Sequence, residues 1–399
     1  MLTFQVETHV HDLCSLPTEL IIKLLDELDF RSLLLCRQVC RFFQTIIDED
    51  AALQYKIELA VAGMEDGPPS ARSPAERLAK LKARQAAWNS LQPSSQKTIP
   101  MLRGEVWELY GGVLAQARGP QSLAFRQLPS DIRGIEEKEW MIEDVGIAIR
   151  DFGMDPAQDL LVVIETPLGR IVNTHLLELS TGRRHPIASK SVLSYRPAGS
   201  HSFAIQISGD FLGVFFISGD ESESELLIWN WKTGDRELCV YSCDGAEVAS
   251  FAFLSDRHVL IVGVNLPDAP LEDQQQPGLV LFVIDFLKTP ADTQDIKDVD
   301  FLCTFHYPTL SPLATPLAMT VRSDPAPSWK PHHDLLVPFY TSREDRLIVV
   351  TLWVADRLVV RSLLLLVPSS ILLSRVNSLA PGEFKRHFPW EEWGPQVLV

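Results

Sequence analysis

Apolar residues in the first 60 positions recur at intervals of three and four, the spacing that puts side chains on one face of an α-helix. A first helix is predicted with Pro17 in its first turn, where the backbone N–H that proline lacks would have no partner within the helix. Asp29 is a potential N-cap for a second helix, and the apolar spacing continues through residues 39–47 and 53–61. The chain is therefore expected to begin with short amphipathic helices. The stripe of the first helix consists of Leu16, Leu20, Ile21, Leu24, Leu25 and Leu28.

A stretch rich in glycine and proline at residues 63–70 indicates turns before the next helix. Ser73, Pro74 and Glu76 then match a capping box with proline at the first helical position. The helix that they open carries Trp88 near its end. Its basic residues are interpreted as a solvated face, with a patch for phosphate or for an acidic partner as the alternative. These residues are Arg77, Lys80, Lys82 and Arg84.

Beyond residue 95, short runs of Val, Ile, Phe and Leu alternate with clusters of Gly, Pro, Asp and Ser, a pattern typical of strands joined by turns. A weak repeat runs through this region, in which residues 176–179, 228–231 and 282–285 each precede a similar turn. The threonines of the three turns, at positions 181, 233 and 289, are offset by 52 and 56 residues. Each copy follows a partner strand that an aspartate opens. These aspartates are Asp159, Asp210 and Asp256, and Asp334 is expected to continue the series.

Such a repeat matches one four-stranded blade of a β-propeller, and the remaining 300 or so residues could hold six or seven blades of about 40 to 50 residues. A pair of β-sandwiches is the alternative fold. Gly111 and Gly112 are predicted to form a hairpin turn. Ring closure is expected to bring residues 106–114 close to residues 358–367. The two tryptophans at residues 390 and 393 indicate that the C-terminal segment is held against the domain.

The opening helices resemble an F-box, the domain by which adaptor proteins dock onto the Skp subunit of cullin-based SCF ubiquitin ligases. The matching segments are Leu-Pro-Thr-Glu-Leu-Ile-Ile-Lys-Leu-Leu-Asp-Glu-Leu at 16–28, Asp-Phe-Arg-Ser-Leu-Leu at 29–34 and Cys-Arg-Gln-Val-Cys-Arg-Phe-Phe at 36–43. Where the family often has Leu-Trp, this chain has Leu-Gln-Tyr at 53–55. The resemblance covers residues 13–58, and the layout of the whole chain is similar to F-box proteins abundant in fungi.

The resemblance implies a non-catalytic adaptor that binds Skp and, through it, cullin, and that presents an unknown substrate protein through its β-domain. It implies an F-box at 13–58, linker helices at 59–95 and a propeller-like domain at 96–399. The alternatives are an F-box scaffold outside any ligase and an unrecognised propeller enzyme. No cofactor, metal or catalytic residue is expected. The residues expected to dock Skp or to hold the fold are Leu16, Pro17, Leu20, Leu28, Val39 and Phe43.

Composition agrees with a globular protein, since 46% of the 399 residues are hydrophobic and 22% are charged. The net charge of −16 argues against a nucleic-acid partner. Six sparse cysteines indicate a reducing, intracellular location, in the cytoplasm or nucleus. Residues 1–13 lack the basic start of a secretory signal. Charges and a proline interrupt the apolar runs at 347–354 and 358–373, which therefore predict buried strands rather than a membrane span.

Several groups with possible chemistry are interpreted as structural. Cys36 and Cys40 are expected to be small buried thiols. The pair at 239 and 243 is expected to lie on a strand and to face the interior of the protein. Residues 332–334, His-His-Asp, lie between a proline-rich stretch and a strand, so they are predicted to form a surface turn. On a strand, neighbouring residues point to opposite faces, so His332 and His333 could not both join one site there. The acidic run at 220–225 is interpreted as a solvated loop.

Overall fold

The computed structural model describes residues 16–93, 95–102, 106–167, 169–199, 201–218, 224–242, 247–264, 278–311, 314–344, 346–356 and 359–397. The chain divides into two compact units. The helical unit holds the chain up to Thr98 together with two later segments, Ser130–Ile135 and Asp334–Thr341. The propeller unit holds the rest.

The described residues of the helical unit form five α-helices. The Asp29 side chain accepts hydrogen bonds from the backbone of Arg31 and Ser32 at 2.8 and 3.0 Å, so the predicted N-cap is confirmed. The capping box of Ser73 and Glu76 is also present. The helices are α1 (Thr18–Asp26), α2 (Phe30–Val39), α3 (Arg41–Glu49), α4 (Ala51–Val61) and α5 (Pro74–Ser90).

Two hydrophobic clusters hold these helices together. The first joins α1 to α4 and consists of Ile21, Leu25, Leu33, Ile46, Ile47, Leu53 and Ile57. The second is centred on Tyr55, Leu59, Leu81 and Phe339, so it takes one member from far along the chain. Burial of these side chains stabilises helices that are too short to be stable alone in water.

A short strand replaces part of the turn expected at residues 63–70. It is β1 (Met64–Asp66), which pairs antiparallel with β20 (Phe339–Thr341). A Cβ atom on Gly67 would lie 1.8 Å from the carbonyl oxygen of Val337, so this close approach requires glycine. The prediction that Asp334 opens another blade strand is wrong, because Asp334–Thr341 belongs to the helical unit.

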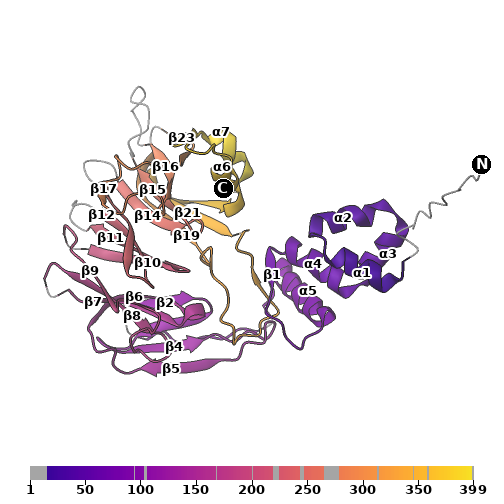
Figure 1. Cartoon of the computed structure of the whole chain (residues 1–399). Coiled ribbons are helices and arrows are strands. Elements are labelled where there is room, and N and C mark those ends of the chain that lie inside the picture. The colour runs from indigo at the N-terminus through magenta and orange to yellow at the C-terminus, as the bar shows by residue number, and fades with distance from the viewer. Residues whose placement is uncertain are drawn as a thin grey trace, which may run out of the picture. The chain divides into compact units, whose positions relative to one another are not determined.

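Five sheets of the propeller unit follow one another around a common centre in the described part of the chain (Figure 1). We call them blades 1 to 5. Blade 1 contains β2 (Trp107–Tyr110), β3 (Val113–Ala117), β4 (Leu123–Gln127) and β5 (Lys138–Ile142). Blade 2 contains β6 (Ile149–Asp155), β7 (Leu160–Glu165), β8 (Val172–Glu178) and β9 (Val192–Tyr195).

The later blades are less regular, because two of them take an extra strand from elsewhere. Blade 3 contains β10 (His201–Ser208), β11 (Phe211–Ser218), β12 (Ser224–Asn230), β13 (Asp235–Ser242) and β17 (Thr293–Asp295). Blade 4 contains β14 (Glu247–Phe253), β15 (His258–Val264), β16 (Leu279–Asp285), β18 (Cys303–His306) and β23 (Arg386–Phe388). Blade 5 contains β19 (Ala314–Ser323), β21 (Leu347–Asp356) and β22 (Val359–Pro368).

The three copies of the sequence repeat occupy equivalent positions in three blades. They lie at β8, β12 and β16, the third strand of blades 2, 3 and 4, and the strands that an aspartate opens are β7, β11 and β15. The propeller is therefore confirmed against the sandwich alternative. The prediction of six or seven blades is wrong: the described residues form five. The repeat offsets of 52 and 56 residues were already longer than the blade length of about 40 to 50 residues from which six or seven blades were expected.

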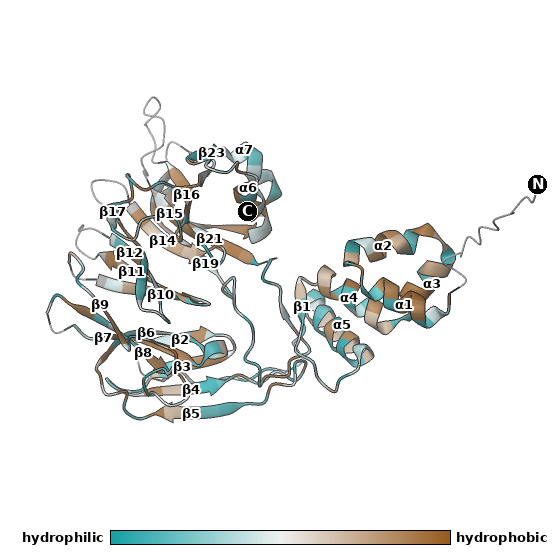
Figure 2. Cartoon of the chain, in the orientation of Figure 1, coloured by the Kyte–Doolittle hydropathy of each residue, from teal (hydrophilic) through white to brown (hydrophobic). Residues whose placement is uncertain are grey.

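Four hydrophobic clusters lie between successive blades, from blades 1 and 2 through to blades 4 and 5. Hydrophobic residues accordingly run through inner parts of strands such as β12 and β16, as they do through α1 (Figure 2). Blades 2, 3 and 4 bury both faces because a neighbouring blade covers each of them, which explains why their inner strands lack strict alternation of apolar and polar residues.

The two ends of the ring are not joined into one sheet. In the described residues β2 pairs with β3, and β22 pairs with β21 as the edge strand of blade 5. Instead, the backbone N–H of Ala326, in the connection after β19, donates to the Tyr110 hydroxyl on β2 at 3.1 Å. Gly111 and Gly112 form the predicted turn after β2, with φ of 58° and 81°.

The C-terminal segment returns from blade 5 to blade 4. After α6 (Ser369–Asn377), β23 pairs in parallel with β18, and α7 (Trp390–Trp393) follows. Trp393 is fully buried, and its indole N–H donates to the carbonyl of His306 at 3.2 Å. The prediction that this segment is held against the domain is confirmed.

The apolar runs near the C-terminus form strands, but not buried ones throughout. Alternate residues of β21 are buried, whereas the first six residues of β22 are exposed. The second run also ends differently from the prediction, because residues from Ser369 onward form helix α6. In the described residues, no helix is long and apolar enough to cross a membrane.

Candidate docking surface on the N-terminal helices

Helices α1 to α3 turn one face inward and leave a second apolar face outside. On α1, Ile21 and Leu25 are buried in the core, while the neighbouring Leu20 and Leu24 are 47% and 52% exposed. An ordinary core helix would carry polar residues at such outward positions. This face is therefore more hydrophobic than the stability of the helical unit requires.

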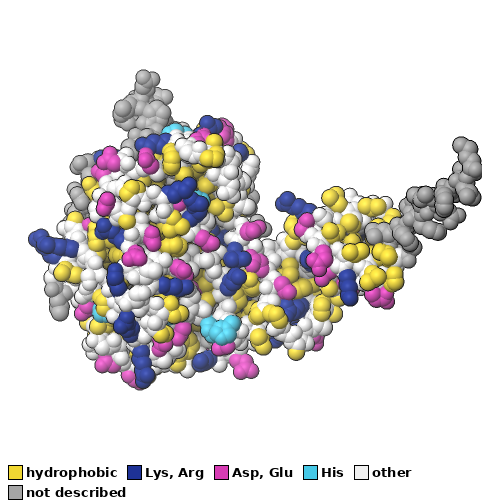
Figure 3. All heavy atoms as spheres, viewed as in Figure 1, with side chains coloured by type: hydrophobic (Ala, Val, Ile, Leu, Met, Phe, Trp, Pro, Cys, Tyr) yellow, Lys and Arg dark blue, Asp and Glu magenta, His cyan; other side chains and the backbone are white. Residues whose placement is uncertain are grey.

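The same holds for α2 and α3, where large apolar side chains lie outside the core. Figure 3 shows hydrophobic side chains gathered over these helices. Exposed apolar residues in such a group typically mark a surface that a partner covers. We call this group the apolar face, and it consists of Leu20, Leu24, Leu35, Val39 and Phe42.

The six residues predicted for docking or folding fall into two groups of three. The structure places Pro17, Leu20 and Val39 outside, where a partner can reach them. The other three are half-buried and pack against the cluster that joins α1 to α4, so they contribute to the fold as well. These are Leu16, Leu28 and Phe43.

The structure adds three exposed residues that sequence reasoning did not single out for docking, namely Leu24, Leu35 and Phe42. Leu24 follows Leu20 by four positions and Leu35 precedes Val39 by four, so each pair shares one side of its helix. This spacing was readable from the sequence. What the sequence did not contain was which side of each helix the core would take.

Polar contacts join α2 to α3, which together carry most of the apolar face, and α3 to α4. The Arg37 guanidinium donates to both carboxylate oxygens of Asp48, at 2.7 and 3.1 Å. The same contact holds the pKa of the Asp48 carboxyl below its usual value. Gln54 on α4 donates to the carbonyl of Ile47 at 2.9 Å. Because these bonds lie at helix ends, they orient the helices without covering the apolar face.

The cysteines of these helices are half-buried rather than buried, which corrects the prediction. Cys36 packs against the helical core, and Cys40 lies between the end of α2 and the start of α3. Cys239 on β13 is buried, as expected, and residue 243 lies outside the described residues.

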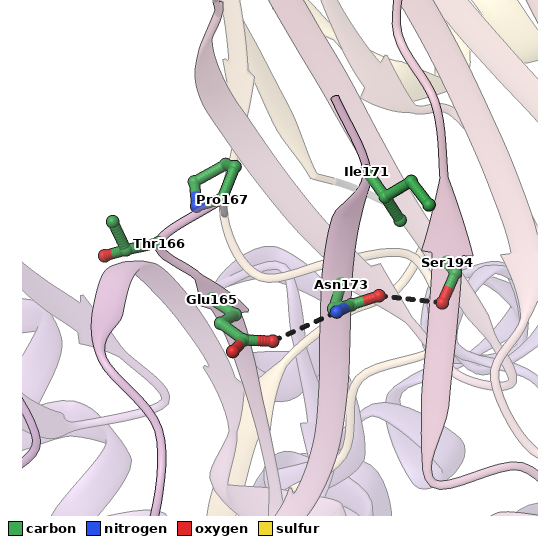
Figure 4. Close-up of a pocket in the computed structure, with 6 residues that line it drawn as sticks. All are labelled: Glu165, Thr166, Pro167, Ile171, Asn173 and Ser194. Atoms are coloured by element: carbon green, nitrogen blue, oxygen red, sulfur yellow. Dashed lines mark hydrogen bonds between the residues drawn. The ribbon is translucent and has the colours of Figure 1, made fainter. Parts of the chain in front are cut away.

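The propeller unit has a pocket of about 340 Å³ at blade 2 (Figure 4). A row of hydrogen bonds crosses it, because Asn173 donates to Glu165 at 3.1 Å and accepts from Ser194 at 2.8 Å. His175 contacts the same Glu165 carboxylate at 3.1 Å. The Ser194 hydroxyl thus faces an amide oxygen, which is not a base, so this row orients polar groups and does not activate a nucleophile.

A group of charged residues lies on the first strands of blades 1, 2 and 5. Burial, with the negative charge of Asp151 on β6, raises the pKa of Glu108 on β2 to about 7. The Arg322 guanidinium on β19 opposes this rise. Burial also raises the pKa of Asp151. Glu108 therefore changes its charge near neutral pH.

Two other predicted features take a different form. Glu225, in the acidic run at 220–225, is buried on β12, where its carboxylate accepts from the Tyr195 hydroxyl and from the Ala198 backbone at 2.7 Å. The solvated-loop prediction is thus wrong at this residue, and residues 220–223 lie outside the described residues. Residues 332–334 do lie at a turn, as predicted, but there their potential ligand atoms come within 4.8 Å of one another.

Comparison with protein families identifies one domain. Residues 13–59 match the F-box-like family, the same region whose helices carry the apolar face. No curated protein sequence matches the chain significantly.

Solved structures similar to the chain share 10% sequence identity with it, at a TM-score of 0.33. Kluyveromyces lactis Hsv2 with complete loop 6CD is one, with 68% of this chain and 75% of that chain covered. The uncharacterized protein lmo1340 from Listeria monocytogenes EGD-e is another, at 67% and 69%. Likenesses this distant transfer no function. Residues 13–59 are thus an F-box-like domain, and it is followed by a strand-rich region arranged as a five-bladed β-propeller.

Proposed function

We propose that this chain is the substrate-recognition adaptor of an SCF-type ubiquitin ligase. The F-box-like domain docks onto Skp, Skp connects the chain to cullin, and the propeller unit presents a target protein. The chain itself is a non-catalytic subunit, since ubiquitin transfer takes place on other subunits of the ligase. It works inside the cell, in the cytoplasm or the nucleus.

The observation that carries this proposal is the F-box-like match at residues 13–59, because an F-box implies binding to Skp. The apolar face gives the match a physical basis. Leu35 and Val39 are 65% and 71% exposed on α2, and burying such side chains against a partner contributes about 1.5 to 3 kcal/mol each. Helices that dock by an apolar stripe are a common mode of protein recognition.

The propeller supports the second half of the proposal by its architecture alone. Its blades form a rigid framework, and loops on such a framework are suited to hold partner-binding residues. A fold does not specify a function, so the identity of the target has to come from experiment. A nucleic-acid target is disfavoured by the net charge of −16.

The test uses the full chain with Pro17→Ala and Leu20→Ala combined, measured by co-precipitation with Skp and cullin. Both residues are exposed, so the variant should stay folded. Loss of about 2 kcal/mol per anchor, or about 4 kcal/mol for the two together, would weaken Skp binding by roughly a thousandfold. Val61→Ala is the matched control, because Val61 is an exposed apolar residue at the end of α4.

Three outcomes are distinguishable. Loss of both Skp and cullin in the double variant, with the control unchanged, supports the adaptor. Skp bound without cullin by the unaltered chain would instead favour a scaffold outside the ligase. Unchanged Skp binding by the double variant would contradict the docking proposal. Affinity purification with the proteasome inhibited then identifies propeller-dependent targets.

A further inference from the structure

Helix α5 ends in an apolar pocket of about 350 Å³ that belongs entirely to the helical unit. Ala87, Trp88 and Leu91 line it from the helix end, and Ile132 lines it from the segment Ser130–Ile135. Trp88 is 66% exposed and Leu91 is 81% exposed. Two large apolar side chains at the mouth of one pocket are unusual on a solvated helix.

The backbone at Leu91 adds a second observation. This residue caps α5 in the left-handed conformation, with φ of 51° and ψ of 34°. Glycine is the usual residue at such a cap, because a Cβ atom strains the backbone in this conformation. The strained cap holds an exposed leucine beside the pocket, although nothing in the helical core requires that side chain.

The charge around the pocket is positive. Of the four basic residues of α5, Arg77 pairs with Asp66 at 2.5 Å and Lys82 lies 3.8 Å from Glu58. Arg84 lines the pocket, and within the described residues no carboxylate lies within ion-pair distance of it or of Arg133. Burial and the nearby positive charge of Arg133 lower the pKa of Arg84.

A third cation lies close by, because Lys80 donates to the carbonyl of Ile132 at 3.1 Å. The C-terminal end of a helix carries about half a negative charge, which is less than these cations supply. The rest of the chain is acidic, with a net charge of −16. Ions screen charges beyond about 8 Å at physiological salt, so the local cations dominate at the pocket.

We propose that this pocket docks a segment of a partner protein in which a large apolar side chain is flanked by aspartate or glutamate. The apolar side chain fills the space beside Trp88 and Leu91. A flanking carboxylate pairs with the Arg84 guanidinium, whose planar fork suits bidentate contact. The inference goes beyond Skp docking, because the pocket uses α5 and not the apolar face.

Two other occupants are disfavoured by charge. A second copy that docked through the same pocket would place its own Arg84 and Arg133 against the same cations of the first copy. A nucleic acid would need a longer track of cations than Arg84, Arg133 and Lys80 provide. The acidic, apolar peptide alone matches both the pocket and its rim.

The experiment selects peptides from a display library of random 12-residue sequences on the full chain and measures the enriched peptides by fluorescence polarisation. We expect enriched sequences to combine acidic residues with an aromatic or large aliphatic one. Trp88→Ala and Arg84→Ala should each weaken their binding by about tenfold or more. Raising the salt concentration should weaken the binding as well.

Matched controls make the result specific. Lys82→Ala removes the same charge from the same helix, and Trp107→Ala removes another exposed tryptophan. Both should bind the peptides like the unaltered chain, and circular dichroism should show that all four variants are folded. The proposal is overturned if enriched peptides are neutral or basic, if none is enriched, or if Arg84→Ala and Trp88→Ala bind normally. Concentration-dependent dimerisation that Trp88→Ala abolishes would also overturn it, in favour of a second copy.

Discussion

The phenol hydroxyl of Tyr55 donates a hydrogen bond to the backbone carbonyl of Pro338, with 2.6 Å between the two oxygen atoms. The two residues are 283 positions apart in the sequence, yet both belong to the helical unit. The same carbonyl accepts the N–H of Gly67 at 3.0 Å. A late segment of the chain thus completes the unit that begins with the F-box-like domain.

Tyr55→Phe should loosen that late segment. The change removes the hydroxyl that contacts both the buried Pro338 carbonyl and, at 2.9 Å, the Asp66 carboxylate, a loss of about 1 kcal/mol or more. Hydrogen exchange of the amides in Asp334–Thr341 should therefore become faster, as measured by mass spectrometry. Tyr340→Phe is the control, because its hydroxyl bonds to the more exposed Glu65 and its loss should matter less. Equal exchange rates in Tyr55→Phe and the unaltered chain would contradict the role of this bond.

Substitutions at two leucines of α2 should affect folding and docking separately. Leu33 is fully buried and Leu35 is 65% exposed. Leu33→Ala should lower the free energy of unfolding by about 2 to 5 kcal/mol, since it leaves a cavity in the helical core. Leu35→Asp should leave urea unfolding nearly unchanged and weaken Skp binding. If Leu35→Asp binds Skp as tightly as the unaltered chain, α2 is not part of the docking surface.

The propeller unit should become less stable as the pH rises from about 4.5 to 7. The pKa of Glu108 is about 7 in the folded chain, above the ordinary value of 4.5, so the folded state holds a proton that the unfolded state releases. Stability therefore falls as pH rises through this window. Glu108→Gln removes the titrating group and should raise the melting temperature at pH 8 but hardly at pH 4.

Glu143→Gln is the control for this pH experiment, because Glu143 is an exposed carboxylate of the same unit. Its melting temperature should follow that of the unaltered chain at every pH. A Glu108→Gln variant whose advantage does not grow with pH would show that the carboxyl ionises normally in the folded chain.

The C-terminal segment should stabilise blade 4. Deleting residues 385–399 removes β23 from the sheet and Trp393 from its buried site, so the melting temperature of the propeller unit should drop. Trp393→Ala alone should cost about 3 to 5 kcal/mol. Trp107→Ala offers the comparison, since Trp107 is 55% exposed and should cost far less. Calorimetry that finds equal melting for both tryptophan variants would be inconsistent with this packing.

Local patterns determined much of the helical unit and of the repeat. The cap at Asp29 and the capping box at Ser73 depend on contacts within four residues, so sequence spacing was sufficient to predict them. The second and third strands of blades 2 to 4 were also readable, because each blade repeats the same local pairing. The F-box resemblance was readable because it depends on short contiguous segments of the sequence, at 16–28, 29–34 and 36–43.

Long-range packing decided the rest. The number of blades depends on how many sheets close one ring, and the pairing of β1 with β20 joins segments 275 residues apart, as the contact of Glu65 with Tyr340 shows. Burial of Glu225 follows from its place on β12, although its neighbours in sequence are acidic. The apolar face of α1 to α3 was likewise decided by packing, because it lies on the sides of these helices that the core does not occupy. Local sequence fixes a residue's element, whereas its exposure depends on what other parts of the chain cover it, and only the tertiary structure decides that.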